Sequence, residues 1–395
     1  MMVHIRDVPR GSVVQYQEYS VCEEGENMNI TFLIGNGFDL NLDLQTQYES
    51  FLKKYTATED PDNQLLTNFK KHILEEADLW SNAEMAFGNY TQKMVGNNNN
   101  AEDFCICHED FCEKLANYLD EQETQIDFSA LKAEIGASFA QSIAFQNIIK
   151  GFREESQTQL KDAASNFSDG YNYNFISFNY TKTLDKCIDC MRSRPALLGR
   201  RTYRNVPHDN SIGKLYHVHG YTDSDMVLGI NDESQISAPE LFDGFGPEYK
   251  NQLIKQQTNK MNEQGIDKKV HSLIQNSDLL YIYGMSIGET DALWWQRIAS
   301  TMKNKGNLHL IIHCYDAPRE GLIRRKYQTF STAQKEHFLS FSDLPSNEKT
   351  VLMDKIHIDN SNIFVLLRDT VTQRLISDEE LQQMSDEELR ALAKL

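Results

Sequence analysis

The chain reads Asn29-Ile-Thr-Phe-Leu-Ile-Gly-Asn-Gly-Phe-Asp39 in the stretch that decides its fold. The apolar and β-branched run from Ile30 to Ile34 predicts a buried strand. It stops at Gly35-Asn36-Gly37, where a backbone without Cβ atoms can turn sharply and approach a ligand closely. Such a turn after a buried strand is typical of α/β nucleotide-binding folds, in which backbone N–H groups bind phosphate. Because Leu40 stands where a third glycine would be expected, an ordinary tight turn is an equal alternative.

The composition is that of a globular protein, with 395 residues, 40% hydrophobic and 25% charged. With 58 acidic and 39 basic residues, the net charge of −19 disfavours nucleic acid and anionic membrane as partners. Seven cysteines without disulfide-like spacing suit a reducing compartment. No apolar run has the length of a membrane span or a signal peptide. We therefore expect a cytoplasmic protein that binds neither membrane nor nucleic acid.

Helical periodicity fills roughly 120 residues between the first strand and the second, at 173–179, far more than a βαβ crossover needs. We expect a large helical insert at about 60–168 that could cover the site. Later strands alternate with helical segments, which predicts an α/β fold with a mostly parallel, Rossmann-like sheet covered on both faces. These further strands are expected at 215–219, 226–230, 278–283 and 308–314.

The sequence suggests three parts. Residues 1–27 are polar and without pattern, which predicts a disordered N-terminal extension. Residues 28–345 form the expected α/β domain with its helical insert, and 346–395 form a C-terminal segment. This segment ends in an acidic repeat at 377–389, whose two capping boxes predict short helices. A solvated tail and a partner-binding helix are equal alternatives for it.

Four polar motifs end predicted strands, and the carboxyl ends of parallel strands share one edge of a sheet, where ligands bind. We therefore expect the motifs to meet in one crevice. They are Gly35-Asn36-Gly37, Phe178-Asn179-Tyr180-Thr181, His217-Val-His219-Gly220 and Gly284-Met-Ser286-Ile-Gly288.

Asn179 can orient a water or a sugar hydroxyl, or it can cap the helix that follows. His217 and His219 lie two apart on a strand and are expected to share a face. His219, at the strand end, is the candidate general base, whereas His217 is expected to pack in the core. Gly284 and Ser286 would present a small turn and a hydroxyl to the ligand.

Two carboxylates follow the glycine-containing motifs. Asp39 could accept hydrogen bonds from ribose hydroxyls but would repel a nearby phosphate. Asp291 begins a helix, where either capping or ligand binding would suit a carboxylate. No metal is expected, because the lone Cys187-Ile-Asp-Cys190 and the scattered thiols do not supply four ligands.

The same motifs carry a family resemblance. Phe32-Leu-Ile-Gly-Asn-Gly-Phe-Asp-Leu40, followed by Tyr48 to Phe51, resembles the opening of the bacteriophage abortive-infection AbiH family. Three later motifs fit that family in the same order, so that the resemblance covers about residues 28–315. More distantly, the set is similar to sirtuin-like NAD-binding proteins. The later motifs are Ser177-Phe-Asn-Tyr-Thr181, His217-Val-His-Gly220 and Gly284-Met-Ser-Ile-Gly-Glu-Thr-Asp291.

The sirtuin-like resemblance implies roles for individual residues. Asn179 would hold the water or ribose and His219 would be the catalytic histidine, while Gly35 and Gly37 would contact the NAD phosphates. Asp39 replaces the serine usual after the glycine turn, and the paired C-x-x-C zinc module after His-Gly is absent, which disfavours protein deacylation. The full cofactor-binding set is Gly35, Asn36, Gly37, Asp39, Gly284, Ser286 and Asp291.

Together these features predict an antiphage abortive-infection defence protein that hydrolyses NAD or a related nucleotide at the glycosidic bond. The alternatives are a nucleotide-binding sensor without catalysis, and a nuclease or phosphohydrolase, which would need a metal site. A phage-derived trigger or a partner defence protein, and assembly into a homo-oligomer, are compatible with each of these functions.

Overall fold

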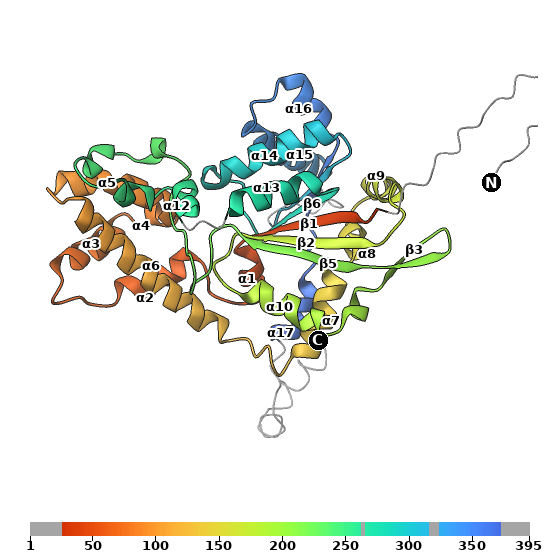
Figure 1. Ribbon diagram of the computed structural model, residues 1–395, viewed down its shortest axis with the longest axis horizontal. Helices are drawn as coiled ribbons and strands as arrows, with labels where there is room; N and C mark the ends of the chain where they lie inside the picture. Colours follow the sequence, from red (N-terminus) through yellow and green to blue (C-terminus); the bar gives the residue numbers. More distant parts are fainter. Residues whose placement is uncertain (1–25, 262–264, 316–323, 373–395) are drawn as a thin grey trace, which may run out of the picture.

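The computed structural model describes residues 26–261, 265–315 and 324–372. Its centre is a sheet of six parallel strands in the order β5-β2-β1-β6-β7-β8 (Figure 1). This sheet confirms the predicted α/β class and the mostly parallel, Rossmann-like arrangement. The order is that of doubly wound dinucleotide-binding folds, with the switch point between β1 and β6. The strands are β1 (Met28–Ile34), β2 (Tyr171–Ser177), β5 (Ser211–His217), β6 (Leu279–Tyr283), β7 (His309–His313) and β8 (Ile356–Asp359).

Alternate residues of the central strands enter apolar clusters on opposite faces of the sheet. In β1, Phe32 joins one cluster and its neighbour Leu33 joins the other; in β6, Tyr281 and Ile282 divide in the same way. Phe32 stacks on Phe175 of β2, with ring centroids 5.4 Å apart. Because both faces are covered, these strands read as nearly continuous apolar runs, which made them recognisable in the sequence.

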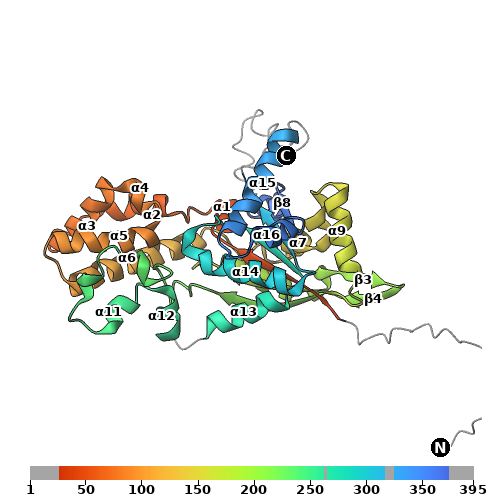
Figure 2. The same ribbon diagram turned by 90° about the horizontal axis from the view of Figure 1, so that it is seen from above.

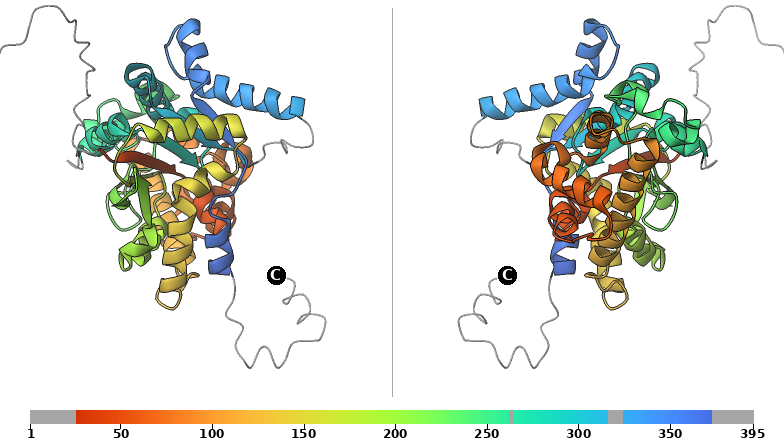
Figure 3. Two further views of the ribbon diagram at one scale, coloured as in Figure 1. Left: turned by 90° about the vertical axis from the view of Figure 1, so that its right-hand side faces the viewer. Right: turned by 90° about the vertical axis from the view of Figure 1, so that its left-hand side faces the viewer.

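Helices cover both faces of the sheet, which lies between them when the molecule is viewed along its long axis (Figure 3). The cluster that contains Phe32 packs against α7 (Lys132–Ile143), α8 (Phe145–Lys150), α9 (Glu154–Ser165), α10 (Thr183–Arg192) and α17 (Val365–Thr372). The cluster that contains Leu33 packs against α13 (Ile266–Asn276), α14 (Ala292–Lys305), α15 (Arg324–Ser340) and α16 (Ser346–Met353).

A helical lobe with an apolar core of its own stands beyond the carboxyl ends of the strands (Figures 1 and 2). Aromatic rings fill this core, among them Phe69, Trp80, Phe87 and Phe111. The helices of the expected insert at about 60–168 therefore belong to two different parts of the molecule. The helices α3 to α6 build the lobe, whereas α7 to α9 pack on the sheet. The lobe contains α2 (Tyr48–Thr56), α3 (Gln64–Glu75), α4 (Ala77–Trp80), α5 (Ala83–Gly96), α6 (Ala101–Glu123), α11 (Pro247–Asn251) and α12 (Lys255–Met261).

Some elements differ from the prediction. The strand expected at 226–230 is wrong: only Ile230 makes an isolated bridge, to Ile254, and the side chains of Met226, Leu228 and Ile230 pack into the lobe. A hairpin of β3 (Arg200–Tyr203) and β4 (Val206–Asp209) was not predicted. The sheet also includes β8, which lies beyond the division expected at residue 345 and pairs with β7.

Most of both chain ends lies outside the described residues. Residues 1–25 of the expected N-terminal extension and the acidic repeat at 377–389 are outside the described residues. Within the described ranges, no helix combines the length and the apolar composition needed to cross a membrane.

Candidate functional site

A cavity of about 400 Å³ opens at the carboxyl ends of the strands, at the switch point between β1 and β6. Doubly wound folds bind their ligands at this place. The helical lobe stands beside the same edge (Figure 2) and supplies part of the cavity wall, including Tyr48, Ser81, Asn82 and Glu84. All of the predicted site residues except Gly37 line the cavity: Gly35, Asn36, Asp39, Asn179, His219, Gly284, Ser286 and Asp291.

The glycine turn after β1 packs directly against the turn after β6. The N–H of Gly35 donates to the Tyr283 carbonyl at 3.0 Å, and the N–H of Gly37 donates to the Gly284 carbonyl at 2.8 Å. A Cβ atom on Gly37 would lie 2.5 Å from Gly284 Cα, and Gly284 itself has a φ of 67°. The glycines therefore allow two backbone turns to touch. Contrary to the expectation, these two N–H groups are already used and are not left for a phosphate.

Asn179 follows β2 and ties that strand end to the glycine turn. Its Nδ2 donates to the Gly35 carbonyl at 3.1 Å. The capping alternative is wrong, because α10 begins at Thr183 and has Lys182 at its N-cap. Since Nδ2 fixes the orientation of the amide and no donor among the described residues reaches Oδ1, that oxygen can accept a hydrogen bond from a water or hydroxyl in the cavity.

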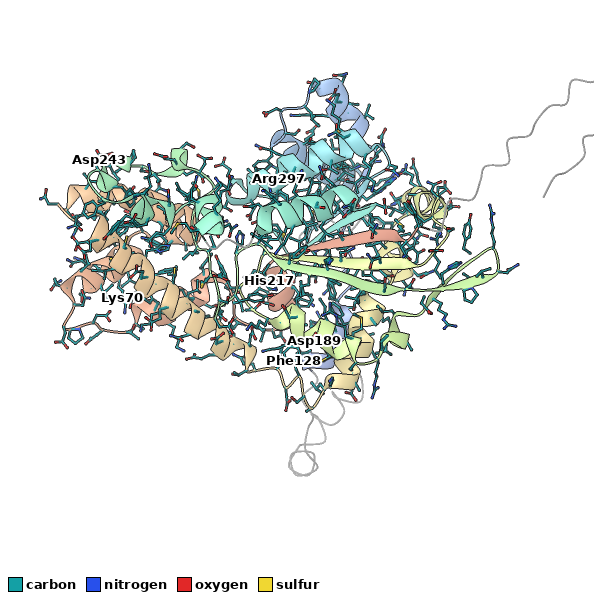
Figure 4. All side chains as sticks on the ribbon, viewed as in Figure 1. Lys70, Phe128, Asp189, His217, Asp243 and Arg297 are labelled. Atoms are coloured by element: carbon teal, nitrogen blue, oxygen red, sulfur yellow. The ribbon has the colours of Figure 1, made fainter. Side chains whose placement is uncertain are left out.

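The two histidines have different surroundings. His217, the last residue of β5, lies beside α10 (Figure 4), with Nδ1 2.9 Å from the Asn179 carbonyl and Nε2 2.9 Å from Asp185 Oδ2. His219 lines the cavity, with Nε2 3.5 Å from Asp291 Oδ1. The expected common face is not kept, because β5 ends at His217 and strand alternation does not extend to His219.

The two ring nitrogens of His219 have different surroundings. Its side chain is 4% exposed, and the only polar partner that the described residues offer its ring is Asp291, since Nδ1 has none. A neutral imidazole that directs Nε2–H to a carboxylate carries its lone pair on Nδ1. Nδ1 has no partner among the described residues, but protein atoms enclose it, so a group bound in the cavity reaches this nitrogen only after the ring turns.

Asp39 is a buried carboxyl beside the cavity. Its Oδ2 accepts a hydrogen bond from the Thr181 hydroxyl at 2.6 Å, whereas Oδ1 has no partner in the described part of the chain. Burial raises the pKa of Asp39 from 3.8 to about 7, although the Thr181 hydrogen bond acts in the opposite direction. The carboxyl is thus largely protonated below neutral pH.

We expect Asp39→Asn to change how stability depends on pH. In the wild type, the free energy of unfolding falls as the pH rises from about 4 to about 7, because the unfolded carboxyl ionises first; above pH 7 this contribution is constant. The slope is at most about 1.4 kcal/mol per pH unit. Asparagine keeps an acceptor for Thr181 but does not titrate, so the variant should gain stability over the wild type as the pH rises. Urea unfolding at pH 5 and pH 8 measures this gain, and parallel pH profiles would contradict it.

A buried ion network that sequence reasoning did not find borders the cavity. Lys255 Nζ lies 2.9 Å from Glu84 Oε2 and 3.4 Å from Asp291 Oδ1, and it donates to the Thr290 carbonyl at 3.2 Å. Burial lowers the pKa of Lys255, but the carboxylates of Asp291 and Glu84 outweigh it and hold that pKa above its ordinary value. Burial raises the pKa of Asp291, but Lys255 and His219 outweigh it and hold that pKa below its ordinary range. Both groups are therefore ionised at neutral pH.

Two tyrosines complete the polar wall. Burial raises the pKa of the Tyr48 and Tyr180 phenols well above 10.0, and the Glu84 carboxylate acts in the same direction. Both phenols therefore stay protonated and can donate hydrogen bonds. The Tyr180 hydroxyl donates to the Val227 carbonyl at 3.2 Å.

The cysteines and histidines of the described ranges form no group of three potential metal ligands. Cys187 and Cys190 lie buried on α10 as free thiols. Burial raises the pKa of both, which makes these thiols poor nucleophiles near neutral pH.

Comparison with models of protein families gives a match. A family model described as bacteriophage abortive infection AbiH matches residues 31–313, which is more than half of the 395-residue chain. The matched region contains every predicted site residue. No curated protein shows significant sequence similarity to the chain.

Proposed function

The chain belongs to the bacteriophage abortive infection AbiH family, and from that premise we propose that it hydrolyses the N-glycosidic bond of NAD or a related nucleotide. Family membership indicates a role in abortive-infection defence. The observation that carries the chemical proposal is the meeting of Asn179, His219 and Asp291 at one cavity on the switch point of the sheet. Loss of the cofactor would stop metabolism in an infected cell.

The arrangement suits hydrolysis through an oxocarbenium-like transition state. The bond between C1′ and the nicotinamide nitrogen breaks, and its electron pair leaves with the ring. Asn179 Oδ1 holds the water that attacks C1′, because its Nδ2 is fixed on Gly35. The proton that this water loses passes to the His219 ring once a turn of the ring brings its unpaired Nδ1 to the cavity, while Asp291 stabilises the imidazolium that forms. Carboxylates near C1′ also favour the positive charge of the transition state.

The direct test is to incubate the purified chain with NAD and to separate the products by chromatography. We expect free nicotinamide and ADP-ribose in equal amounts, at a rate proportional to protein concentration. Absence of both products after long incubation at high protein concentration would contradict the proposal.

A sensor without catalysis is favoured by one observation. The cavity has walls from both the sheet and the lobe, and Lys255 on α12 joins Glu84 of the lobe to Asp291 before α14. A ligand bound there contacts both the sheet and the helical lobe, and it can change how the lobe packs against the sheet. Tight nucleotide binding without any turnover in the wild type would favour this second function.

A further inference from the structure

The cavity offers a ligand very little positive charge. Among the residues that the structure describes, no arginine or lysine lines it. The ammonium of Lys255 is not part of the cavity lining. Its three N–H donors already face Glu84, Asp291 and the Thr290 carbonyl.

Two backbone donors of the glycine turn are used as well. The N–H groups of Gly35 and Gly37 donate to the Tyr283 and Gly284 carbonyls. Phosphates are bound by arginine or lysine side chains and by backbone N–H groups left over at a turn. Within the described residues, no arginine or lysine side chain lines the cavity, and these two N–H groups are not available to a phosphate.

Negative charge, in contrast, is in excess. Glu84 and Asp291 line the cavity, and Lys255 is the one lysine or arginine of the described residues that contacts them both. Their side chains are 12% and 16% exposed, so water screens them less than it screens surface charges. The cavity therefore attracts a cation and repels a phosphate placed inside it.

We propose that the cavity takes the positively charged nicotinamide–ribose end of its substrate and excludes phosphate, so that its preferred substrate class is an unphosphorylated, cationic N-riboside. This inference rests on the proposed function for its reaction. Glu84, which reaches the cavity from α5, is the specificity-determining residue. The volume of about 400 Å³ lies in the lower part of the range for ligand pockets, which suits a nucleoside better than a dinucleotide.

The reaction balances without a further reactant. Water attacks C1′ of the cationic riboside, and the electron pair of the broken C–N bond neutralises the departing nicotinamide. The products are ribose, neutral nicotinamide and one proton, which His219 accepts and passes to solvent. Because the ring loses its positive charge in this step, Glu84 is needed for binding the substrate and not for holding the product.

The test compares nicotinamide riboside, nicotinamide mononucleotide and NAD as substrates of the full chain, with free nicotinamide as the readout. We expect the highest kcat/KM for the riboside. A higher value for either phosphorylated substrate would overturn the inference while leaving the proposed function intact.

If the protein cleaves none of the three, the proposed function fails, and binding decides the inference. Thermal melting with each compound then measures affinity without turnover. A larger shift with nicotinamide riboside than with the mononucleotide supports the inference. A larger shift with the mononucleotide, or no shift with either, overturns it.

Glu84→Gln keeps the shape of the side chain and removes one charge. We expect it to weaken binding of nicotinamide riboside by about tenfold, the worth of one charge-assisted contact. Glu75→Gln is the matched control, because Glu75 lies on the surface of the lobe 3.6 Å from Lys71 and outside the cavity. Unchanged discrimination between riboside and mononucleotide in a folded Glu84→Gln variant would overturn the inference. If this variant does not fold, the comparison of the three substrates on the wild-type protein still tests the inference.

Discussion

Lys255→Met is expected to lower the free energy of unfolding by about 3–5 kcal/mol at pH 7, the usual cost of breaking a buried ion pair from one side. Lys255 is 5% exposed, and its ammonium is the only side-chain cation in contact with Glu84 and Asp291 among the described residues. Methionine fills a similar volume but leaves two neighbouring buried carboxylates without a counter-charge. Urea unfolding followed by tryptophan fluorescence measures the change.

Lys250→Met provides the matched control. Lys250 pairs with Glu233 at 2.7 Å, but the Glu233 side chain is 58% exposed, so water screens the pair. We expect this variant to lose less than about 1 kcal/mol. Equal losses in the two variants would show that burial does not strengthen the Lys255 network.

A lower pH should reduce the loss in free energy of unfolding that Lys255→Met causes. The two carboxylates left behind can take up protons as the pH falls, and a protonated carboxyl needs no counter-charge. The difference between wild type and variant is therefore expected to shrink from pH 7 to pH 5. A double variant with Glu84→Gln should also lose less than the sum of the single changes, because one uncompensated charge is gone.

Strands of the sheet could be predicted where their burial is visible as an apolar local sequence. β1, β6 and β7 are buried on both faces and give nearly continuous apolar runs, whereas β2 is equally buried but carries Asn172 and Asn174 between its aromatic residues. β8 was missed because it is short and alternates isoleucine with His357 and Asp359, which reads as polar sequence. The false strand at 226–230 is equally apolar, but its side chains pack in the lobe and its backbone pairs with no neighbouring strand except at Ile230. Apolarity alone does not distinguish these outcomes.

The candidate site could be predicted only for residues at strand ends. Glu84 and Lys255 lie on helices, and 171 residues separate them, so only the tertiary fold brings them together. One local signal was available: Glu84 shares a buried helical face with Phe87 and Thr91, at spacings of three and seven residues. A lone carboxylate on such a face requires a buried partner.

The role of the glycine turn also could not be predicted from local sequence alone. Gly35-Asn36-Gly37 was read as a turn that presents N–H groups to phosphate, but the same residues permit contact with the turn at Gly284. Both uses need a backbone without Cβ atoms. Which of the two applies depends on how closely β1 and β6 end beside each other, and this distance is set by the sheet.

The largest functional effect is expected from His219→Ala, which should slow nicotinamide release at least about a hundredfold, the usual contribution of a general base. The change removes the imidazole ring to which we assign the proton of the attacking water. It should not unfold the protein, because Asp291 keeps its ion pair with Lys255. Ligand-induced shifts in melting temperature should persist, since the other walls of the cavity are unchanged. Initial rates and melting curves on the same preparation test both expectations.

His217→Gln separates catalysis from packing. His217 is as buried as His219 but does not line the cavity, and it bridges the Asn179 carbonyl and Asp185. Glutamine can keep only part of this bridge, so we expect a lower melting temperature with most of the turnover retained. Equal losses of turnover in two folded variants would mean that the bridge to Asn179 matters as much as the proposed base. If His219→Ala retains full turnover, another group accepts the proton, and the role assigned to Nδ1 is wrong.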